Sequence, residues 1–577
     1  MNRCPTRPAA PLVPQAPRRT PARPALAAVA LLTAMSLGAC SDPGSASDVS
    51  GGTVVMAVNA DVDYLVPALS ATQQGQVVAE LLFDRLADIG DNLNTVGDQG
   101  FRPRLARSWS WSADSLSIAF TLDARARWHD GRPVRATDVR FTWRLYADTL
   151  TGAPFAPLLA NIDSVTERDS LTAVFWFHRR SPEQFFDATY QMLVHPEHLL
   201  RGVPHDQLRT APFGLAPVGT GRFRFVRREP GMRLEIASDT GNYAGRARLD
   251  RVIFSVTRDY QAGVNRLLTR EVDVLDNLRP ETMAGLGAHP ELRAVPYPAL
   301  TYAFLQFALR DGGTSRPHRL FGDLALRRAL LRAIDRKTLL RSVFDSLATI
   351  PLAPAPTALV PADTGLGQAP FDPALAAHLL DSLGWVRTGP DGLRQRGAVP
   401  LRFSVMVPSP SRNRVRYATL MQEQLRTAGV QVDIETLEPA VFSDRLKRRA
   451  FDAVLNSVNT DPTPVTSLRQ SWGGGAAARD GSNRSSYVNP AFDAIVDSAA
   501  ASMSPAAARA HIVRAYRVIN ADVPAIWLYE PRQVAAVHTR LQLPRLRATG
   551  WLSGLADWSI PPAQRIARDR MAAAPKP

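Results

Sequence analysis

The chain has 577 residues, of which 45% are hydrophobic and 21% are charged, and its formal net charge is +15. This composition excludes a disordered or collagen-like chain and predicts a globular protein. Because one hydrophobic core stops growing at about 250–300 residues, we expect at least two lobes.

The positive charge is spread along the chain and does not indicate nucleic-acid binding. The densest basic cluster, Arg445 to Arg449, is typical of a solvent-facing helix end. Cys4 and Cys40 are the only cysteines in the sequence. The chain beyond Cys40 therefore has no disulfide and no thiolate for metal binding or catalysis.

The first 40 residues have the pattern of an export signal. Arginines precede an uncharged run from Ala25 to Ala34, and the box Leu37-Gly38-Ala39-Cys40 follows. The apolar run is shorter than the ~20 residues that span a bilayer, which favours a cleaved segment. The box resembles a bacterial lipoprotein signal, which implies cleavage before Cys40 and attachment of lipid to its thiol. An ordinary secretory signal with an incidental cysteine is the alternative.

Elements of both kinds follow the signal. Residues 52–60 read as a strand and residues 73–86 as a helix. Alternating residues within 101–139 predict a hairpin. Thr137 is the expected N-cap of the next helix, with Asp138 at its positive end.

Further strands and helices alternate after residue 217. The turn at 217–221 opens two strands, 223–227 and 233–237, and apolar residues at helical spacing predict one helix over 323–343. Asp372-Pro373 and Gly384 are start and stop signals of another helix.

The clearest unit is a strand over 401–407, a helix over 414–428 and a strand over 430–434. A unit of this length implies parallel pairing with a right-handed crossover. A strand over 451–455 and a helix from Ser504 to about Asp522 follow. Mixed elements without an internal repeat predict α/β lobes.

Motifs of catalysis are scarce. The sequence has no phosphate-binding loop, no H-E-x-x-H and no G-x-S-x-G. His195-Pro196-Glu197-His198 looks like the first turn of a helix and not like a metal site. Clustered tryptophans at Trp109, Trp111, Trp128 and Trp143 fit core packing better than a ligand cage.

The segment FRPRLARSWSWSADSLSIAFTLDARARWHDGRPVRATDVRFTW, residues 101–143, resembles the characteristic block of the family 5 extracellular solute-binding proteins. These are the peptide, nickel and oligosaccharide receptors of ABC importers. Later blocks of that family occur here in the same order, at 217–225, 242–256, 270–275, 323–336, 371–385, 461–462, 481–493 and 519–530.

The resemblance implies an α/β periplasmic-binding-protein-like fold of type II, in which two hinge strands join two lobes and the first lobe carries an inserted domain. Carried onto this sequence, the expected parts are a signal peptide (1–39), a tether (40–50), lobe I (51–85, 212–298 and 531–577), the inserted domain (86–211) and lobe II (299–530).

The chain departs from the family at places that bear on the ligand. Leu65-Val66-Pro67 lacks the acid usual there, and Phe307-Ala308 replaces a Phe-Asn pair. Val458 stands near the place where oligopeptide receptors have an aspartate that anchors the ligand's α-amine. A buried ammonium group without an anion is costly. A free peptide N-terminus is therefore expected as ligand only if another acid substitutes.

The resemblance also implies candidate ligand contacts on the strand end before residue 462, in the segment after it and near the hinge. These are Tyr302, Gln306, Asn456, Asn459, Asp461, Trp472, Asn483 and Tyr487. Purely structural roles are open for each, such as a turn cap at Asp461 and core packing at Tyr487. Cys40 is the expected lipidation site.

We therefore expect a periplasmic or cell-surface lipoprotein that captures a small solute between hinged lobes and delivers it to the permease subunits of an ABC importer. It is expected to act as a monomer, anchored to the membrane by lipid, without cofactor, metal, nucleic acid or catalysis. Two alternatives stay open: a binding lipoprotein without a transport role, such as a sensor or adhesin, and an extracytoplasmic hydrolase.

Overall fold

The computed structural model describes residues 50–361, 365–388, 391–409, 411–478 and 480–570. The described residues belong to one compact unit, Val49–Pro577. The signal peptide, Cys40 and all but the last residue of the tether lie outside the described residues.

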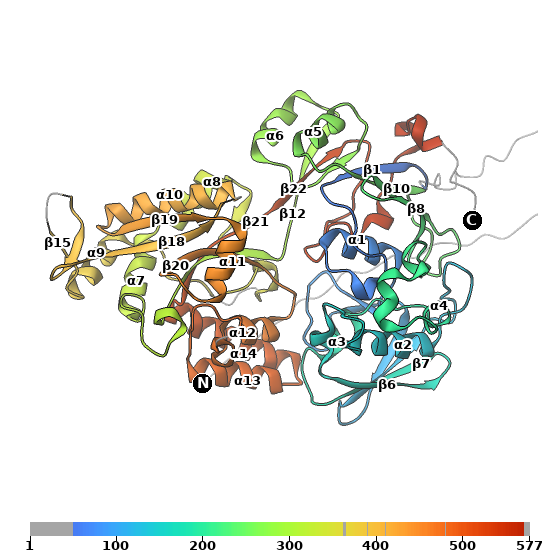
Figure 1. Ribbon diagram of the computed structural model, residues 1–577, viewed down its shortest axis with the longest axis horizontal. Coiled ribbons are helices and arrows are strands. Elements are labelled where there is room, and N and C mark those ends of the chain that lie inside the picture. The colour runs from blue at the N-terminus through green and yellow to red at the C-terminus, as the bar shows by residue number, and fades with distance from the viewer. Residues whose placement is uncertain (1–49, 362–364, 389–390, 410, 479, 571–577) are drawn as a thin grey trace, which may run out of the picture. The chain divides into compact units, whose positions relative to one another are not determined.

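The first lobe is built on a seven-stranded sheet that collects strands from distant parts of the chain (Figure 1). Its central strand β1 pairs in parallel with β10 and β11, while the other neighbours are antiparallel. In spatial order the strands are β12 (Leu292–Tyr297), β22 (Gln533–His538), β11 (Val274–Leu275), β1 (Thr53–Val58), β10 (Arg251–Val256), β9 (Arg233–Ser238) and β8 (Phe223–Glu229). The strands predicted after the turn at 217–221 are confirmed as β8 and β9.

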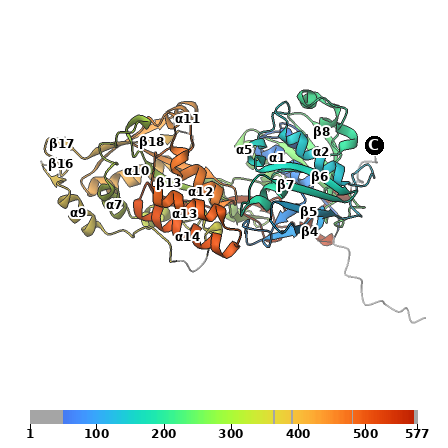
Figure 2. The same cartoon turned by 90° about the horizontal axis from the view of Figure 1, so that it is seen from below.

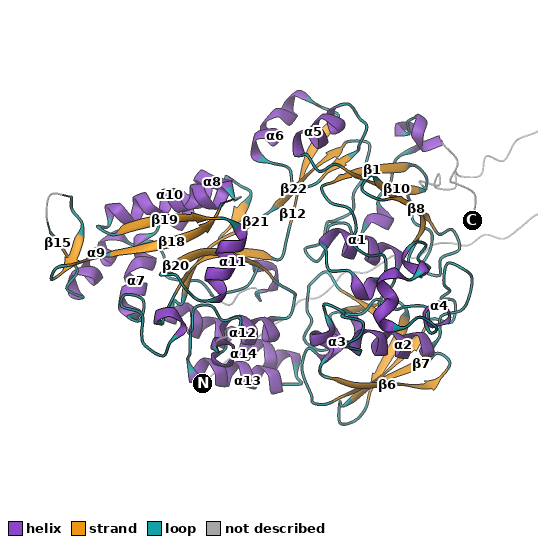
Figure 3. Cartoon of the chain, viewed as in Figure 1, coloured by secondary structure: helices purple, strands orange, loops and turns teal. Residues whose placement is uncertain are grey.

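A four-stranded antiparallel sheet lies in the chain between β1 and β8, as expected of an inserted domain. Figure 3 shows helices α2 and α3 beside its strands β6 and β7. The predicted hairpin is confirmed as β4 and β5, where Trp109 pairs with Phe120. The elements of this region are α1 (Gln73–Leu82), β2 (Ala87–Ile89), β3 (Phe101–Pro103), β4 (Ala106–Trp111), β5 (Ser117–Leu122), α2 (Ala136–Ala147), β6 (Ile162–Asp169), β7 (Thr172–Phe177), α3 (Gln184–Thr189) and α4 (Glu197–Leu200).

The start of α2 differs from the prediction. The helix begins at Ala136, so Thr137 lies inside it and is not the N-cap. The buried carboxylate of Asp138 does the capping, because it accepts the backbone N–H of Arg135 at 2.8 Å. It also accepts the backbone N–H of Glu197 at 2.9 Å, which ties α2 to α4.

The second lobe is built on a six-stranded sheet. Its order is β14 (Ala348–Thr349), β21 (Ala525–Pro531), β13 (Thr301–Phe307), β20 (Ala453–Asn459), β18 (Arg402–Pro408) and β19 (Gln431–Leu437). The predicted strand–helix–strand unit is confirmed, because β18 and β19 pair in parallel over seven residues and α10 connects them. Figure 1 shows α8 and α10 along one side of this sheet.

Helices surround the second sheet, and Figure 2 shows α12, α13 and α14 gathered together. The helices of the second lobe are α7 (Leu324–Ala333), α8 (Arg336–Phe344), α9 (Pro373–Ser382), α10 (Arg412–Thr427), α11 (Pro439–Lys447), α12 (Pro464–Trp472), α13 (Pro490–Ala501) and α14 (Pro505–Asp522). Two more, α5 (Tyr260–Leu268) and α6 (Pro280–Gly285), lie in the chain among the strands of the first sheet. A small sheet of β15 (Val386–Arg387), β16 (Arg394–Arg396) and β17 (Val399–Pro400) completes the lobe.

The helix signals were read correctly at α9 and α14, which Asp372 and Ser504 cap with their side chains. The single helix predicted over 323–343 is wrong. Ile334 is extended and fully buried, and it separates α7 from α8, which starts after the capping residue Asp335.

The chain passes between the two large sheets twice, from β12 to β13 and from β21 to β22. Both connections are short, since three residues separate the first pair of strands and one residue separates the second. None of the helices in the described ranges combines the length and hydropathy needed to cross a bilayer.

Candidate functional site

A cavity of about 600 Å³ lies where the chain crosses between the two sheets. Tyr297, Thr301 and Gln533, which flank the crossings, line it. Other walls come from α1, from residues 459–462 at the end of β20 and from residues 548–553. Its volume is in the range of sites that bind small molecules, roughly 300–1,000 Å³.

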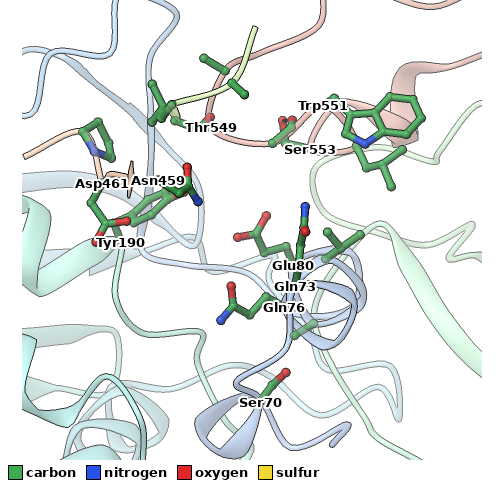
Figure 4. Close-up of a pocket in the computed structure, with 18 of the residues that line it drawn as sticks. Ser70, Gln73, Gln76, Glu80, Tyr190, Asn459, Asp461, Thr549, Trp551 and Ser553 are labelled. Atoms are coloured by element: carbon green, nitrogen blue, oxygen red, sulfur yellow. Dashed lines mark hydrogen bonds between the residues drawn. The ribbon is translucent and has the colours of Figure 1, made fainter. Parts of the chain in front are cut away.

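Helix α1 supplies one wall of the cavity. Gln73, Gln76 and Glu80 are spaced three and four residues apart, which places them on one face of the helix. Figure 4 shows these side chains projecting into the same space as Tyr190 and Asp461. The hydroxyl of Thr72 caps the helix by accepting the backbone N–H of Gly75 at 3.2 Å.

The glycines of the turn at 217–221 hold the end of α1. The backbone N–H of Gly221 donates to the carbonyl of Leu82 at 2.8 Å. A Cβ on Gly219 would lie 1.8 Å from that same oxygen, and one on Gly221 would lie 2.4 Å from the Leu81 oxygen. The backbone approaches too closely for any other residue type, so this family block positions a wall of the cavity.

Arg85 follows α1 and is held by the protein around it. Its Nη2 donates to Glu80 Oε1 at 2.7 Å and its Nε to the carbonyl of Tyr190 at 2.6 Å. The guanidinium lies 4.0 Å from the centre of the Tyr190 ring. Burial works to lower the pKa of Arg85, but Glu80, Tyr190 and Asp88 together more than offset it, so the pKa is raised.

The end of β20 and the residues that follow it supply another wall. Asn459 and Asp461 lie next to Tyr190 in Figure 4. Asn459 Oδ1 accepts a hydrogen bond from the hydroxyl of Thr301 at 3.3 Å. Within the described ranges no residue hydrogen-bonds to the carboxylate of Asp461 or forms an ion pair with it. Desolvation by the surrounding walls raises the pKa of this carboxyl although the residue is open to the cavity, and the charge of Arg85 opposes the rise.

A second cavity of about 360 Å³ shares Gln191 and the segment 459–461 with the first. Tyr302, a predicted contact, lines this second cavity and is otherwise buried on β13. The structure thus brings together three of the predicted residues, Tyr302, Asn459 and Asp461.

The other predicted contacts line neither cavity. Gln306 is buried on β13, and Asn456 accepts the backbone N–H of Ser457 on β20. Trp472 is buried against Phe304 and Trp527.

Asn483 and Tyr487 hold the loop that follows α12. Asn483 is fully buried and donates to the carbonyls of Trp472, Gly473 and Tyr487. The Tyr487 hydroxyl donates to Asp522 at 2.6 Å. These two side chains stabilise the second lobe and lie outside the cavities.

The sequence did not predict most of the residues that line the cavity from the side of α1. The polar residues of α1 had a detectable signal, since their helical spacing marks one face. Arg85, Tyr190 and the segment 548–553 had none, because these three parts of the lining lie more than 100 residues apart from one another in the chain.

Metal-binding side chains do not gather in the described part of the chain: no group of three or more His, Cys, Asp or Glu residues is placed to hold an ion there. His195, for which the sequence did not favour a metal site, is fully buried. Burial lowers the pKa of His195 to about 4.

Known proteins share this sequence pattern and this fold. Residues 100–480, more than half of the chain, match the middle region of bacterial extracellular solute-binding proteins, family 5. A Brucella ovis protein provisionally named as an ABC transporter peptide-binding protein is 27% identical over 469 residues, which are 79% of this chain and 83% of that protein.

Two solved structures have the same fold. The oligopeptide-binding protein AppA of Bacillus subtilis, in complex with a nonapeptide, has a TM-score of 0.68 at 20% identity and covers 89% of this chain and 99% of its own. NikZ of Campylobacter jejuni, in complex with Ni(L-His), has a TM-score of 0.70 at 21% identity. The match covers 88% of this chain and 99% of NikZ. The chain therefore belongs to family 5 of the bacterial extracellular solute-binding proteins.

Proposed function

We propose that this protein is a lipid-anchored receptor that captures a small solute outside the cytoplasm and delivers it to the permease of an ABC importer. The observation that carries the proposal is the cavity of about 600 Å³ at the two chain crossings, because residues from both lobes line it. Membership of a solute-binding family supports the same role.

The mechanism we propose is closure of two lobes around the solute. The short connections between β12 and β13 and between β21 and β22 are the hinge. A solute that contacts both walls binds the closed state better, and this difference in affinity drives closure. To change the closed fraction from 1% to 99%, the solute must bind the closed state more favourably than the open state by about 5.5 kcal/mol.

The proposed parts of the chain keep their predicted bounds. We assign residues 51–85, 212–298 and 531–577 to lobe I, 86–211 to the inserted domain and 299–530 to lobe II. The receptor acts as a monomer in this proposal. Its ligand contacts are Asn459 and Asp461 on one wall and Gln73, Gln76 and Glu80 on the other.

Ligand binding is tested by thermal denaturation with a panel of peptides, sugars and metal chelates. A true ligand at 100 times its Kd adds about 2.7 kcal/mol to the free energy of unfolding and raises Tm. Asn459→Ala should weaken the binding of that ligand. Asn456→Ala, three residues earlier on β20 and outside both cavities, should leave the binding unchanged. A panel without any shift contradicts the proposal.

The lipid anchor is tested through Cys40. The protein expressed with its signal should partition into detergent and incorporate labelled fatty acid. Cys40→Ser should abolish both, because the serine hydroxyl does not replace the thiol that takes the lipid. If labelling persists in the Cys40→Ser variant, the lipid is attached elsewhere and this part of the proposal is wrong.

A further inference from the structure

The charges that line the 600 Å³ cavity do not balance. Its charged side chains in the described ranges are Glu80, Arg85 and Asp461. Two carboxylates face one guanidinium, so the lining carries one excess negative charge when all three are ionised.

Arg85 is not available to a ligand. Its side chain is only 13% exposed, and it is already paired with Glu80. Its Nε is bonded to the Tyr190 carbonyl and its guanidinium covers the Tyr190 ring. A ligand carboxylate that entered the cavity would have to break these contacts to reach the cation.

Asp461 carries the excess charge. It is exposed to the cavity, and no described residue hydrogen-bonds to its carboxylate. An anionic oxygen pair that faces a concave site without a partner attracts a cationic group of a ligand.

The rest of the polar lining is neutral. The side chains of Gln73, Gln191, Asn277 and Gln533 make no hydrogen bond to any residue within the described ranges. A carboxamide offers two donors and one acceptor oxygen, so these side chains suit hydroxyl and amide groups without favouring either charge.

We propose that the solute held in this cavity carries a positive charge and no carboxylate, with Asp461 as the residue that determines this specificity. The inference rests on the proposed receptor function and names its ligand class: amine-bearing molecules rich in hydroxyl or amide groups. Enclosing a carboxylate beside Asp461 without a free cation is unfavourable, since desolvation and repulsion both oppose it.

The adjoining cavity contains a rival arrangement. Arg179 and Arg180 line it, are exposed and have no ion pair with a described residue. A longer zwitterion could place its amine at Asp461 and its carboxylate at these arginines. The experiment therefore has to separate the two cavities.

The proposed preference for a positively charged ligand without a carboxylate is called the charge rule below. Three matched peptides test it: tri-alanine amide, which is a cation, tri-alanine, which is a zwitterion, and N-acetyl-tri-alanine, which is an anion. Calorimetric titration of the full chain should give the tightest binding for the amide, by about tenfold or more over the zwitterion, and the weakest for the anion. Asp461→Asn should remove the preference for the amide. Asp444→Asn, on the exposed face of α11, is the matched control and should leave it unchanged.

A variant that gains binding provides a second test, because a variant that had merely lost its fold would not gain binding. Gln191→Arg places a cation in the wall beside Asp461, so tri-alanine should then bind as tightly as its amide. Equal or tighter binding of the zwitterion by the unmodified protein overturns the proposal. So does a zwitterion whose affinity falls when Arg179 and Arg180 are replaced by Gln.

The charge rule and the receptor function fail in different ways. If no tri-alanine probe binds, the solute found by the wider panel decides: an amine without a carboxylate supports the rule, and a carboxylate overturns it. A panel with no binder at all contradicts the receptor function itself.

Discussion

Arg540 shows what a single buried charge does in the first lobe. It donates to Asp273 at 2.8 Å, to Asp569 at 2.6 Å and to the carbonyl of Thr53 at 2.9 Å, and its side chain is 4% exposed. The two carboxylates belong to segments almost 300 residues apart. Arg540 therefore joins the end of the chain to β1 and to the segment before β11.

Replacing Arg540 should lower the free energy of unfolding. Arg540→Met leaves the buried carboxylate of Asp569 without its ion-pair partner and leaves Asp273 with Arg568 alone. Removal of one member of a buried ion pair costs about 3–5 kcal/mol. The loss is measured as a fall in the free energy of unfolding in urea.

Arg426→Met is the matched control, because the pair of Arg426 with Glu423 is more than 60% exposed on both sides. Exposed pairs contribute little to stability, because water screens them. Equal effects of the two variants would show that the Arg540 cluster does not stabilise the lobe.

At the scale of elements, the break between α7 and α8 is set by two neighbouring residues. Ile334 takes an extended conformation that buries its side chain, and Asp335 starts α8 by accepting the backbone N–H groups of Lys337 and Thr338, each at 3.1 Å. Burial of Ile334 in the core outweighs the continuation of the helix, which periodicity alone could not reveal.

Asp335→Ala should destabilise the second lobe by about 1 kcal/mol, the usual contribution of an N-cap. Burial works to raise the pKa of Asp335, but the hydrogen bonds from Thr338 and Lys337 lower it below its ordinary value of 3.8. The folded carboxyl releases its proton more readily than the unfolded one. The cap therefore stabilises above pH 3.8, and its contribution is lost as the pH falls through the lowered pKa.

The measurement is urea unfolding of the Asp335→Ala variant and the unmodified protein between pH 7 and pH 3. Ser411→Ala is the control, because Ser411 occupies the same position at the start of α10 without a side-chain cap. It should have almost no effect. A difference for Asp335→Ala that persists unchanged at pH 3 would contradict the charge argument.

At the scale of the whole molecule, Glu183 joins two distant regions. It precedes α3 and accepts the backbone N–H groups of Val465 and Thr466 at 2.8 and 3.1 Å, together with the Thr466 hydroxyl at 2.6 Å. These partners form the first turn of α12, where a negative charge is favourable. Glu183 is 2% exposed, so water does not readily replace it.

This contact lies at the second cavity, which Glu183, Val465 and Thr466 line. Tyr190 and Gln191 follow α3, and Thr460 and Asp461 precede α12, so the carboxylate of Glu183 holds together elements that lead into two walls. The Thr95 hydroxyl, which donates to the carbonyl of Pro462, supports the same junction.

Glu183→Ala should lower the free energy of unfolding by about 2 kcal/mol or more, because buried donors lose their acceptor. Hydrogen exchange at Val465 and Thr466 should accelerate. Glu183→Gln should cost less, since its amide oxygen still accepts. Glu167→Ala, which removes a partly exposed partner of Arg140, is the control. Unchanged exchange at the start of α12 would refute the role of Glu183.

The elements of the fold were largely readable from the sequence. The strand–helix–strand unit from β18 to β19 and the capped helices α9 and α14 follow local rules, since the periodicity and the caps that specify them lie within each segment. Two predictions failed where a contact from another element decided the outcome, at Thr137, where Asp138 also binds the start of α4, and at Ile334.

The candidate site was only partly readable. Asn459 and Asp461 were predicted because they end a strand within a recognisable family block. Trp472, Asn483 and Tyr487 follow in the same region of sequence, but the structure packs them into the core of the second lobe. Proximity in sequence did not distinguish a residue that lines a cavity from one that supports it.

The sequence by itself determined the family and most of the succession of strands and helices, because each depends on residues close together in the chain. Only the tertiary structure decided which polar side chains share the cavity and that Arg85 is already neutralised by Glu80. Charges act through space, so the balance around Asp461 exists only after folding brings α1, the end of β20 and the segment 548–553 together.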